Sequence, residues 1–157
     1  PPPPPPAAAR SGGVAAAMAE EFERSLRYSD PLALLRIELD EAAGAEDPRR
    51  EPLAGIVGAG LRPVDLLARR ADGFALLLPS THFPGALAVA ERIIRGARRA
   101  GMGVSVGVSF FPSKDTRSFA DVEAMAEAAL ARAREDGGKI CLYQYQGYLY
   151  SPEEAPR

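Results

Sequence analysis

An arginine and an aspartate three positions apart, Arg62 and Asp65, have side chains suited to holding a ligand together. The planar guanidinium of arginine can donate paired hydrogen bonds to a phosphate or to a guanine edge. A carboxylate accepts hydrogen bonds from the N–H donors of the same base. Pro63 fixes its own backbone φ angle, which lowers the ordering cost of binding. We expect Arg62 and Asp65 to form a pincer; a pair that is buried or locked on itself would leave only an inert scaffold.

Other residues offer less chemistry. His82 and Cys141 are the only histidine and the only cysteine, so no catalytic triad, zinc site or internal disulfide can be assembled from them. Cys141 lies in an apolar run and is expected to be a buried thiol. Glu38 and Asp40 alternate on a predicted strand and share one face of it, where carboxylate oxygens could bind Mg²⁺.

Composition limits the function classes. The 19 basic and 21 acidic residues nearly cancel, which argues against general attraction to nucleic acid or membrane. No apolar run approaches the roughly 20 residues that a membrane span needs. The single cysteine fits a reducing cytoplasm. Because the chain starts with six prolines and no methionine, we expect a fragment of a longer, even membrane-anchored, protein.

The elements that must position these residues follow from hydrophobic periodicity and turn signals. We expect a helix over residues 14–28, a strand over 32–39 and a short helix over 53–61. Strands over 64–69 and 74–78 are joined at Asp72-Gly73. A helix over 79–97, a strand over 104–110, a helix from the Ser118/Asp121 capping box to Gly137 and a strand over 139–145 complete the order.

A hairpin inside two β-α crossovers predicts an α/β (α+β) fold. It is ferredoxin-like, with a mixed central sheet of about five strands flanked by helices. We expect a linker rich in Pro, Ala and Gly over residues 1–13, one domain over 14–146 and a tail over 147–157.

Five segments together resemble GGDEF domains, the diguanylate cyclase family. They are the opening helix and first strand (residues 22–40), a hairpin (66–79), and the later pieces 88–93, 104–108 and 126–134. None is specific alone, but their order and spacing match the family. The resemblance implies a nucleotide-cyclase-like fold. Members of this family condense two GTP molecules across a homodimer, holding metal, triphosphate and guanine.

The features that this reaction requires are altered. Ala71-Asp72-Gly73-Phe74 replaces the Gly-Gly-Asp/Glu-Glu-Phe turn and is one residue shorter, which should shift Asp72. The residues after Asp40 lack the Phe-Lys and the guanine-reading Asn, and Arg134 replaces a phosphate-binding Lys. Glu38 without a nucleotide clamp achieves little as a metal ligand. We therefore expect a degenerate domain with no catalytic residue, no metal site and no required cofactor.

The resemblance assigns another role to Arg62 and Asp65. In many GGDEF domains an Arg-x-x-Asp motif before the hairpin is the inhibitory site for cyclic di-GMP, often as an intercalated dimer that an arginine of a neighbouring domain closes. Arg92 is the candidate for that second arginine and Arg95 the fallback; each is alternatively a solvated helix residue. We expect a cytoplasmic cyclic di-GMP receptor that regulates a fused or partner domain and can form a homodimer.

Two alternatives remain open from the sequence. One is a structural module for dimerisation or protein docking without nucleotide, with a contact surface made of Tyr143, Tyr145, Tyr148 and Tyr150. The other is an allosteric GTP-binding domain that uses Glu38, Asp40 and Arg134.

Overall fold

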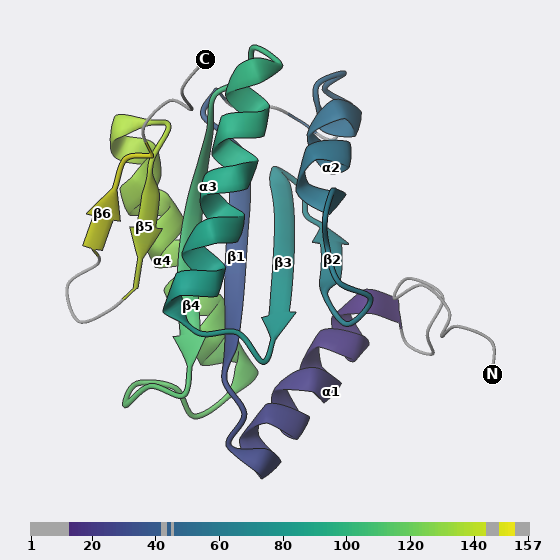
Figure 1. Ribbon diagram of the computed structural model, residues 1–157, viewed down its shortest axis with the longest axis vertical. Helices are drawn as coiled ribbons and strands as arrows, with labels where there is room; N and C mark the ends of the chain where they lie inside the picture. The colour runs from purple at the N-terminus through teal and green to yellow at the C-terminus, as the bar shows by residue number, and fades with distance from the viewer. Residues whose placement is uncertain (1–12, 42–43, 45, 144–147, 153–157) are drawn as a thin grey trace.

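The computed structural model describes residues 13–41, 44, 46–143 and 148–152. These residues form four helices and six strands (Figure 1). Their bounds are α1 Gly13–Tyr28, β1 Leu32–Leu39, α2 Arg50–Gly58, β2 Leu66–Arg69, β3 Gly73–Pro79, α3 Phe83–Arg99, β4 Val104–Phe111, α4 Phe119–Asp136, β5 Ile140–Leu142 and β6 Tyr148–Tyr150. The predicted α/β class and mixed sheet are confirmed.

One six-stranded sheet, in the order β2-β3-β1-β4-β5-β6, forms the centre of the fold. All neighbours are antiparallel except β4 and β5, which the α4 crossover makes parallel. The sheet has one strand more than the about five expected: Tyr148–Tyr150, within the predicted tail from residue 147, pair with β5 as a sixth strand. Residues 1–12 of the predicted linker and residue 145 of the predicted last strand lie outside the described residues.

Helices cover both faces of the sheet. On one face, Leu35 and Ile37 of β1 pack with α2 and α3; on the other, Leu32 and Leu34 pack with α1 and α4. The alternation along β1 therefore buries both sides of the strand. Helix α4 starts at the predicted capping box, in which Ser118 and Asp121 bond each other's backbone N–H groups.

Helix α1 is attached less evenly. Met18 and Phe22 are fully buried against the sheet, whereas Leu26 and Tyr28 are 45% and 66% exposed. In Figure 1 the end of α1 that carries Tyr28 projects beyond the strands. The last turn of α1 therefore lacks the apolar anchoring of its middle.

Candidate functional site

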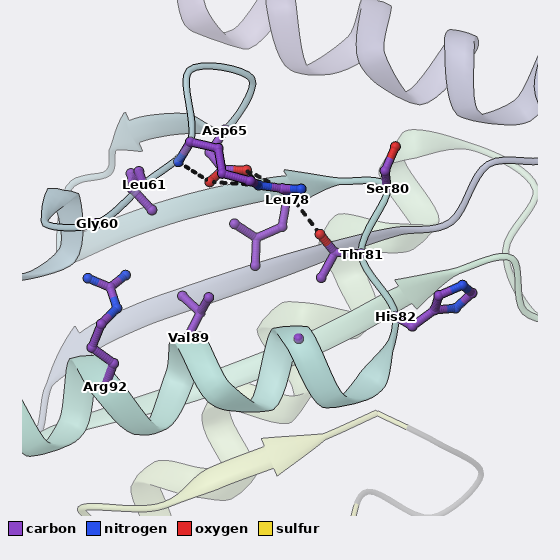
Figure 2. Close-up of a pocket in the computed structure, with 11 residues that line it drawn as sticks. Gly60, Leu61, Asp65, Leu78, Ser80, Thr81, His82, Val89 and Arg92 are labelled. Atoms are coloured by element: carbon purple, nitrogen blue, oxygen red, sulfur yellow. Dashed lines mark hydrogen bonds and ion pairs between the residues drawn. The ribbon is translucent and has the colours of Figure 1, made fainter.

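A pocket of about 360 Å³ lies between the loop that follows α2, the end of β3 and the first half of α3 (Figure 2). Arg62, Asp65 and Arg92, the three predicted ligand residues, all line it. Leu78 and Val89 supply apolar wall between the charged groups. The structure thus brings the three residues into one concave site of a single chain, whereas Arg92 was expected to act from a neighbouring domain. Their role as ligand contacts stays a prediction.

Arg62 and Asp65 are bound to each other. Nη2 of Arg62 lies 2.8 Å from Oδ1 of Asp65, and Nε lies 3.2 Å from the same oxygen. The backbone N–H of Arg62 donates to Oδ2 at 2.7 Å. The Asp65 side chain is only 4% exposed, against 47% for Arg62. The free pincer is therefore wrong: both Asp65 oxygens are engaged by Arg62, and Asp65 positions the arginine instead of facing a ligand. The pair alone no longer supports a receptor, so a receptor proposal must rest on another contact in this pocket.

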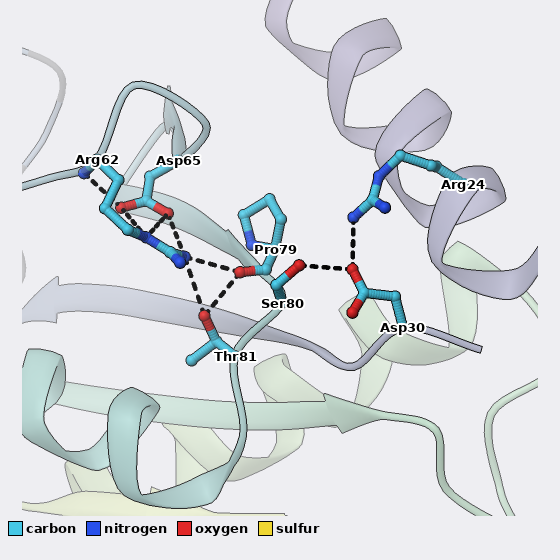
Figure 3. A network of polar contacts seen from close by, with 7 residues as sticks. All are labelled: Arg24, Asp30, Arg62, Asp65, Pro79, Ser80 and Thr81. Atoms are coloured by element: carbon cyan, nitrogen blue, oxygen red, sulfur yellow. Dashed lines mark hydrogen bonds and ion pairs between the residues drawn. The ribbon is translucent and has the colours of Figure 1, made fainter. Parts of the chain in front are cut away.

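The guanidinium of Arg62 has two further acceptors (Figure 3). Its Nη2 donates to the carbonyl oxygen of Pro79 at 2.7 Å and to Oγ1 of Thr81 at 3.0 Å. Within the described residues, no hydrogen bond is formed by the other terminal nitrogen, Nη1. One edge of the fork is thus fixed by the protein, and Nη1 remains for a ligand.

Arg92 has a hydrogen-bond donor without an acceptor. It rises from α3 toward the loop that carries Gly60, and its Nη2 is buried with no hydrogen-bond partner (Figure 2). Burial lowers the pKa of Arg92, an effect that nearby Asp65 opposes, but an arginine stays charged at neutral pH. A Cβ on Gly60, which has φ +75°, would lie 3.5 Å from Nη1 of Arg92. A buried donor without a partner carries a desolvation cost that an acceptor on a ligand would relieve.

The fallback residue Arg95 lies outside this pocket. Its Nη2 is 3.1 Å from Glu91 on the same helix, and it is not among the lining residues. The geometry favours Arg92 over Arg95 as the second arginine.

The hairpin turn at the other end of β3 is closed by the chain's own side chains. Arg70 and Gly73 exchange backbone hydrogen bonds around Ala71-Asp72. Arg50 of α2 is 6% exposed and donates to the carbonyl oxygens of Ala71 at 3.1 Å and Arg70 at 2.8 Å. A Cβ on Gly73 would overlap the carbonyl oxygen of Ile37. Sequence reasoning missed Arg50, because nothing in its local sequence marks it as buried.

The acidic residues of β1 also have partners within the chain. Oε1 of Glu38 accepts from Nη1 of Arg134, an exposed residue of α4, at 2.9 Å. Arg36 lies 3.7 Å from Glu38 and 2.8 Å from Glu127. Burial raises the pKa of Glu38, and the two arginines oppose that rise. The Nε of Arg36 is buried without a partner.

Asp40 joins three segments. It accepts hydrogen bonds from the hydroxyl of Ser105 on β4 and from the backbone N–H of Gly138 at 2.9 Å. Among the described residues, no three His, Cys, Asp or Glu side chains gather as a metal site. Both carboxylates of the predicted metal face are thus committed to contacts within the fold.

Two tyrosines of the proposed contact surface pack inward. Tyr143 contacts the small cluster around Cys141, and Tyr150 packs on the main core. Tyr145 lies outside the described residues. The side chain of Tyr148 is likewise outside what the structure describes, and Tyr143 and Tyr150 are partly buried. Among the helices that the structure describes, none has the length and apolarity for a membrane span.

Comparison with known proteins relates the fold to one family. No family model and no curated protein sequence matches the chain. The GGDEF domain of TpbB (YfiN) from Pseudomonas aeruginosa is 23% identical, with a TM-score of 0.72 over 82% of this chain and 86% of that domain. The diguanylate cyclase SiaD from the same organism, solved with its activator SiaC, is 27% identical, with a TM-score of 0.68 over 81% of this chain and 55% of SiaD.

A third solved structure is a microbial GGDEF domain described in its interaction with bis-(3′,5′)-cyclic di-GMP. It is 18% identical, with a TM-score of 0.66 over 82% of this chain and 89% of that one. The fold is therefore that of a GGDEF domain, with structural neighbours that include a cyclase and a domain studied with cyclic di-GMP.

Proposed function

We propose that this GGDEF-like domain is a catalytically inactive receptor for cyclic di-GMP, which binds in the pocket between Arg62 and Arg92. The observation that carries the proposal is the buried Nη2 of Arg92, which has no acceptor in the protein, on a side chain that lines the same pocket as Arg62. A ligand that supplies acceptors satisfies this donor and the free Nη1 of Arg62 together.

The charged groups of the pocket select the ligand chemistry. Since Asp65 is engaged by Arg62, the charged groups available to a ligand are guanidinium edges, which favour phosphate oxygens and the O6 and N7 acceptors of guanine. Cyclic di-GMP carries both kinds of acceptor. A volume of about 360 Å³ is at the low end for ligand pockets, so it takes one base or phosphate while the rest lies across the opening.

The absence of cyclase activity is part of the proposal. Phosphoryl transfer between nucleotides needs positioned metal and a loop that closely approaches the phosphates. In this chain Arg50 holds the carbonyls of the shortened turn, and Arg134 pairs with Glu38. These contacts use the groups that the reaction would need. Incubation with GTP and Mg²⁺ or Mn²⁺ should yield no cyclic di-GMP above blank, and clear turnover would refute this part.

Calorimetric titration with cyclic di-GMP tests the receptor. The wild type should bind saturably, and Arg62→Ala and Arg92→Ala should each weaken binding by about tenfold or more, since each removes a charged hydrogen bond. Arg99→Ala is the matched control, because Arg99 is an exposed arginine of α3 outside the pocket lining. A wild type without saturable binding would remove the receptor proposal. A metal-dependent thermal shift with GTP but none with cyclic di-GMP would favour the allosteric GTP alternative.

Regulation follows if the ligand prefers one arrangement of the domain with its fused or partner protein. A ligand shifts such an equilibrium only by its difference in affinity for the two states. We propose that the domain works in the cytoplasm without a required cofactor, and that its partner carries the output.

A further inference from the structure

A chain of polar contacts connects the pocket to α1 (Figure 3). Arg62 holds the carbonyl oxygen of Pro79 and the hydroxyl of Thr81 on either side of Ser80. The hydroxyl of Ser80 donates to Oδ2 of Asp30 at 2.5 Å. The same Oδ2 accepts from Nη2 of Arg24, on α1, at 2.7 Å. Residues 79–81 are thus hydrogen-bonded to Arg62 in the pocket and, through Asp30, to Arg24 on α1.

The backbone at this junction is strained. Ser29 and Ser80 are the two non-glycine residues with positive φ in the part of the chain that the structure describes, at 54° and 49°. They flank the facing ends of β1 and β3, where Leu32 pairs with Pro79. The left-handed region is unfavourable for such residues and persists where surrounding contacts enforce it. The polar contacts of Ser80 are therefore part of what holds this conformation.

The last turn of α1 depends on the same contacts. Leu26 and Tyr28 are exposed, and the hydroxyl of buried Ser25 has no partner, so this turn has little apolar attachment of its own. Its backbone is held to Asp30, whose N–H donates to the carbonyl oxygen of Ser25 at 3.0 Å. Arg24 links it to Asp30 and is also braced by Glu21 at 2.9 Å. The hydrogen bond from Ser80 and that from Arg24 lower the pKa of Asp30, which keeps this link charged. An element with few fixed contacts is one that a small free-energy change can loosen or tighten.

From this arrangement we propose that Ser80, Asp30 and Arg24 are positioning residues for Arg62, and that they couple occupancy of the pocket to the seating of α1. This inference rests on the proposed receptor function. A seated α1 fixes the 79–81 turn, the turn fixes Nη2 of Arg62, and Nη1 is then presented to the ligand. Coupling is reciprocal, so a ligand that is held by Arg62 stabilises the seated α1 by the same factor.

The first test measures affinity in variants that lie outside the pocket. Arg24→Ala should weaken binding of cyclic di-GMP by about fivefold, at the low end of ordinary coupling. Arg24→Lys, which keeps a charge for Asp30, should restore most of that loss. Arg27→Ala is the matched control, because Arg27 is an exposed arginine of the same helix without a contact to Asp30.

The second test reads α1 itself. In the wild type, saturating cyclic di-GMP should slow amide hydrogen exchange over residues 21–28 by about fivefold, by the same reciprocity. In Ser80→Ala, cyclic di-GMP at saturation should leave that exchange unchanged. A merely structural role for Ser80 would alter exchange equally with and without ligand.

The outcomes separate the two proposals. If the wild type binds cyclic di-GMP but α1 exchange does not respond, or Arg24→Ala binds as well as Arg27→Ala, the coupling is refuted and the receptor stands. If the wild type does not bind cyclic di-GMP at all, the receptor proposal fails and the coupling fails with it.

Discussion

The two ends of β3 use arginine in opposite ways. At the Gly73 end, Arg50 is buried on two turn carbonyls, and nearby Arg134 is paired with Glu38. At the Pro79 end, Arg92 has a buried nitrogen with no acceptor, and Arg62 has one terminal nitrogen without a hydrogen bond in the described chain. The difference teaches that a concentration of arginine does not mark a site by itself. The chain's own acceptors close one end, and the other end is where we propose that a ligand binds.

Gly73→Ala should give the largest effect, at the closed end. A Cβ there would overlap the backbone carbonyl of Ile37, and β1 cannot shift without disturbing both neighbouring strands. We expect the free energy of unfolding to fall by about 3 kcal/mol in urea titration. Gly55→Ala is the control: a Cβ on Gly55 meets nothing within 4 Å, so that variant should gain about 0.5–1 kcal/mol. Equal stabilities for the two variants would contradict the tight closure.

Arg50→Met should come next. It keeps an apolar stem but removes the donors to Arg70 and Ala71 and the stacking on Phe74, whose ring centroid lies 5.5 Å from the guanidinium. A loss of about 2 kcal/mol is expected from two partly buried carbonyls without donors. Arg49→Met, beside it in sequence and 36% exposed, should lose less than about 1 kcal/mol. Cyclic di-GMP binding should be unchanged in both, and a loss of binding in Arg50→Met would break the separation of the two ends.

Arg134→Ala should lower the free energy of unfolding by about 1 kcal/mol and raise the pKa of Glu38. Burial already raises the pKa of Glu38 above its ordinary 4.5, and Arg134 opposes that rise, so the variant should raise the pKa further. The folded state then holds this proton more tightly than the unfolded state, so stability falls as pH rises from 4.5 through the folded value. Carbon-detected NMR of the Glu38 carboxyl measures it. Arg132→Ala, a surface variant, should leave the Glu38 pKa in place, and an unmoved pKa in Arg134→Ala would argue against the pair.

Arg92→Met should give the smallest change in stability, of opposite sign. Because it removes a buried donor that has no acceptor, the ligand-free domain should gain up to about 1 kcal/mol in urea titration while losing cyclic di-GMP affinity. That result would sharpen the contrast with Arg50→Met. A destabilisation as large as that of Arg50→Met would show instead that Arg92 has a structural role.

Local patterns in the sequence were enough to predict most of the fold. The predicted strand 32–39 has the bounds of β1, and the Ser118 capping box is present, because both depend on neighbours in sequence. The sixth strand was missed because three residues, Tyr148–Tyr150, give too short an alternation to recognise.

The site was predicted less completely. Spacing shared with a family singled out Arg62, Asp65 and Arg92, with Arg92 expected to act from a neighbouring domain. That all three line one pocket of the same chain, and that Arg62 engages Asp65, depends on side-chain geometry. The contacts of Arg50 and Arg134 join residues 20 and 96 positions from their partners. Such contacts leave no local periodic signal, so single-sequence reasoning could not find them.

The strand formed by Tyr148–Tyr150 has a consequence for how this domain can be handled. It hydrogen-bonds Ile140–Leu142, whose side chains are fully buried and apolar, and Arg98 of α3 fastens the following turn through the carbonyl of Pro152 at 2.9 Å. Without this cover, β5 would present open backbone donors and acceptors along an apolar strand, which invites pairing between molecules. A domain truncated at residue 146 would therefore lack β6, expose the backbone edge of β5 and be prone to aggregate.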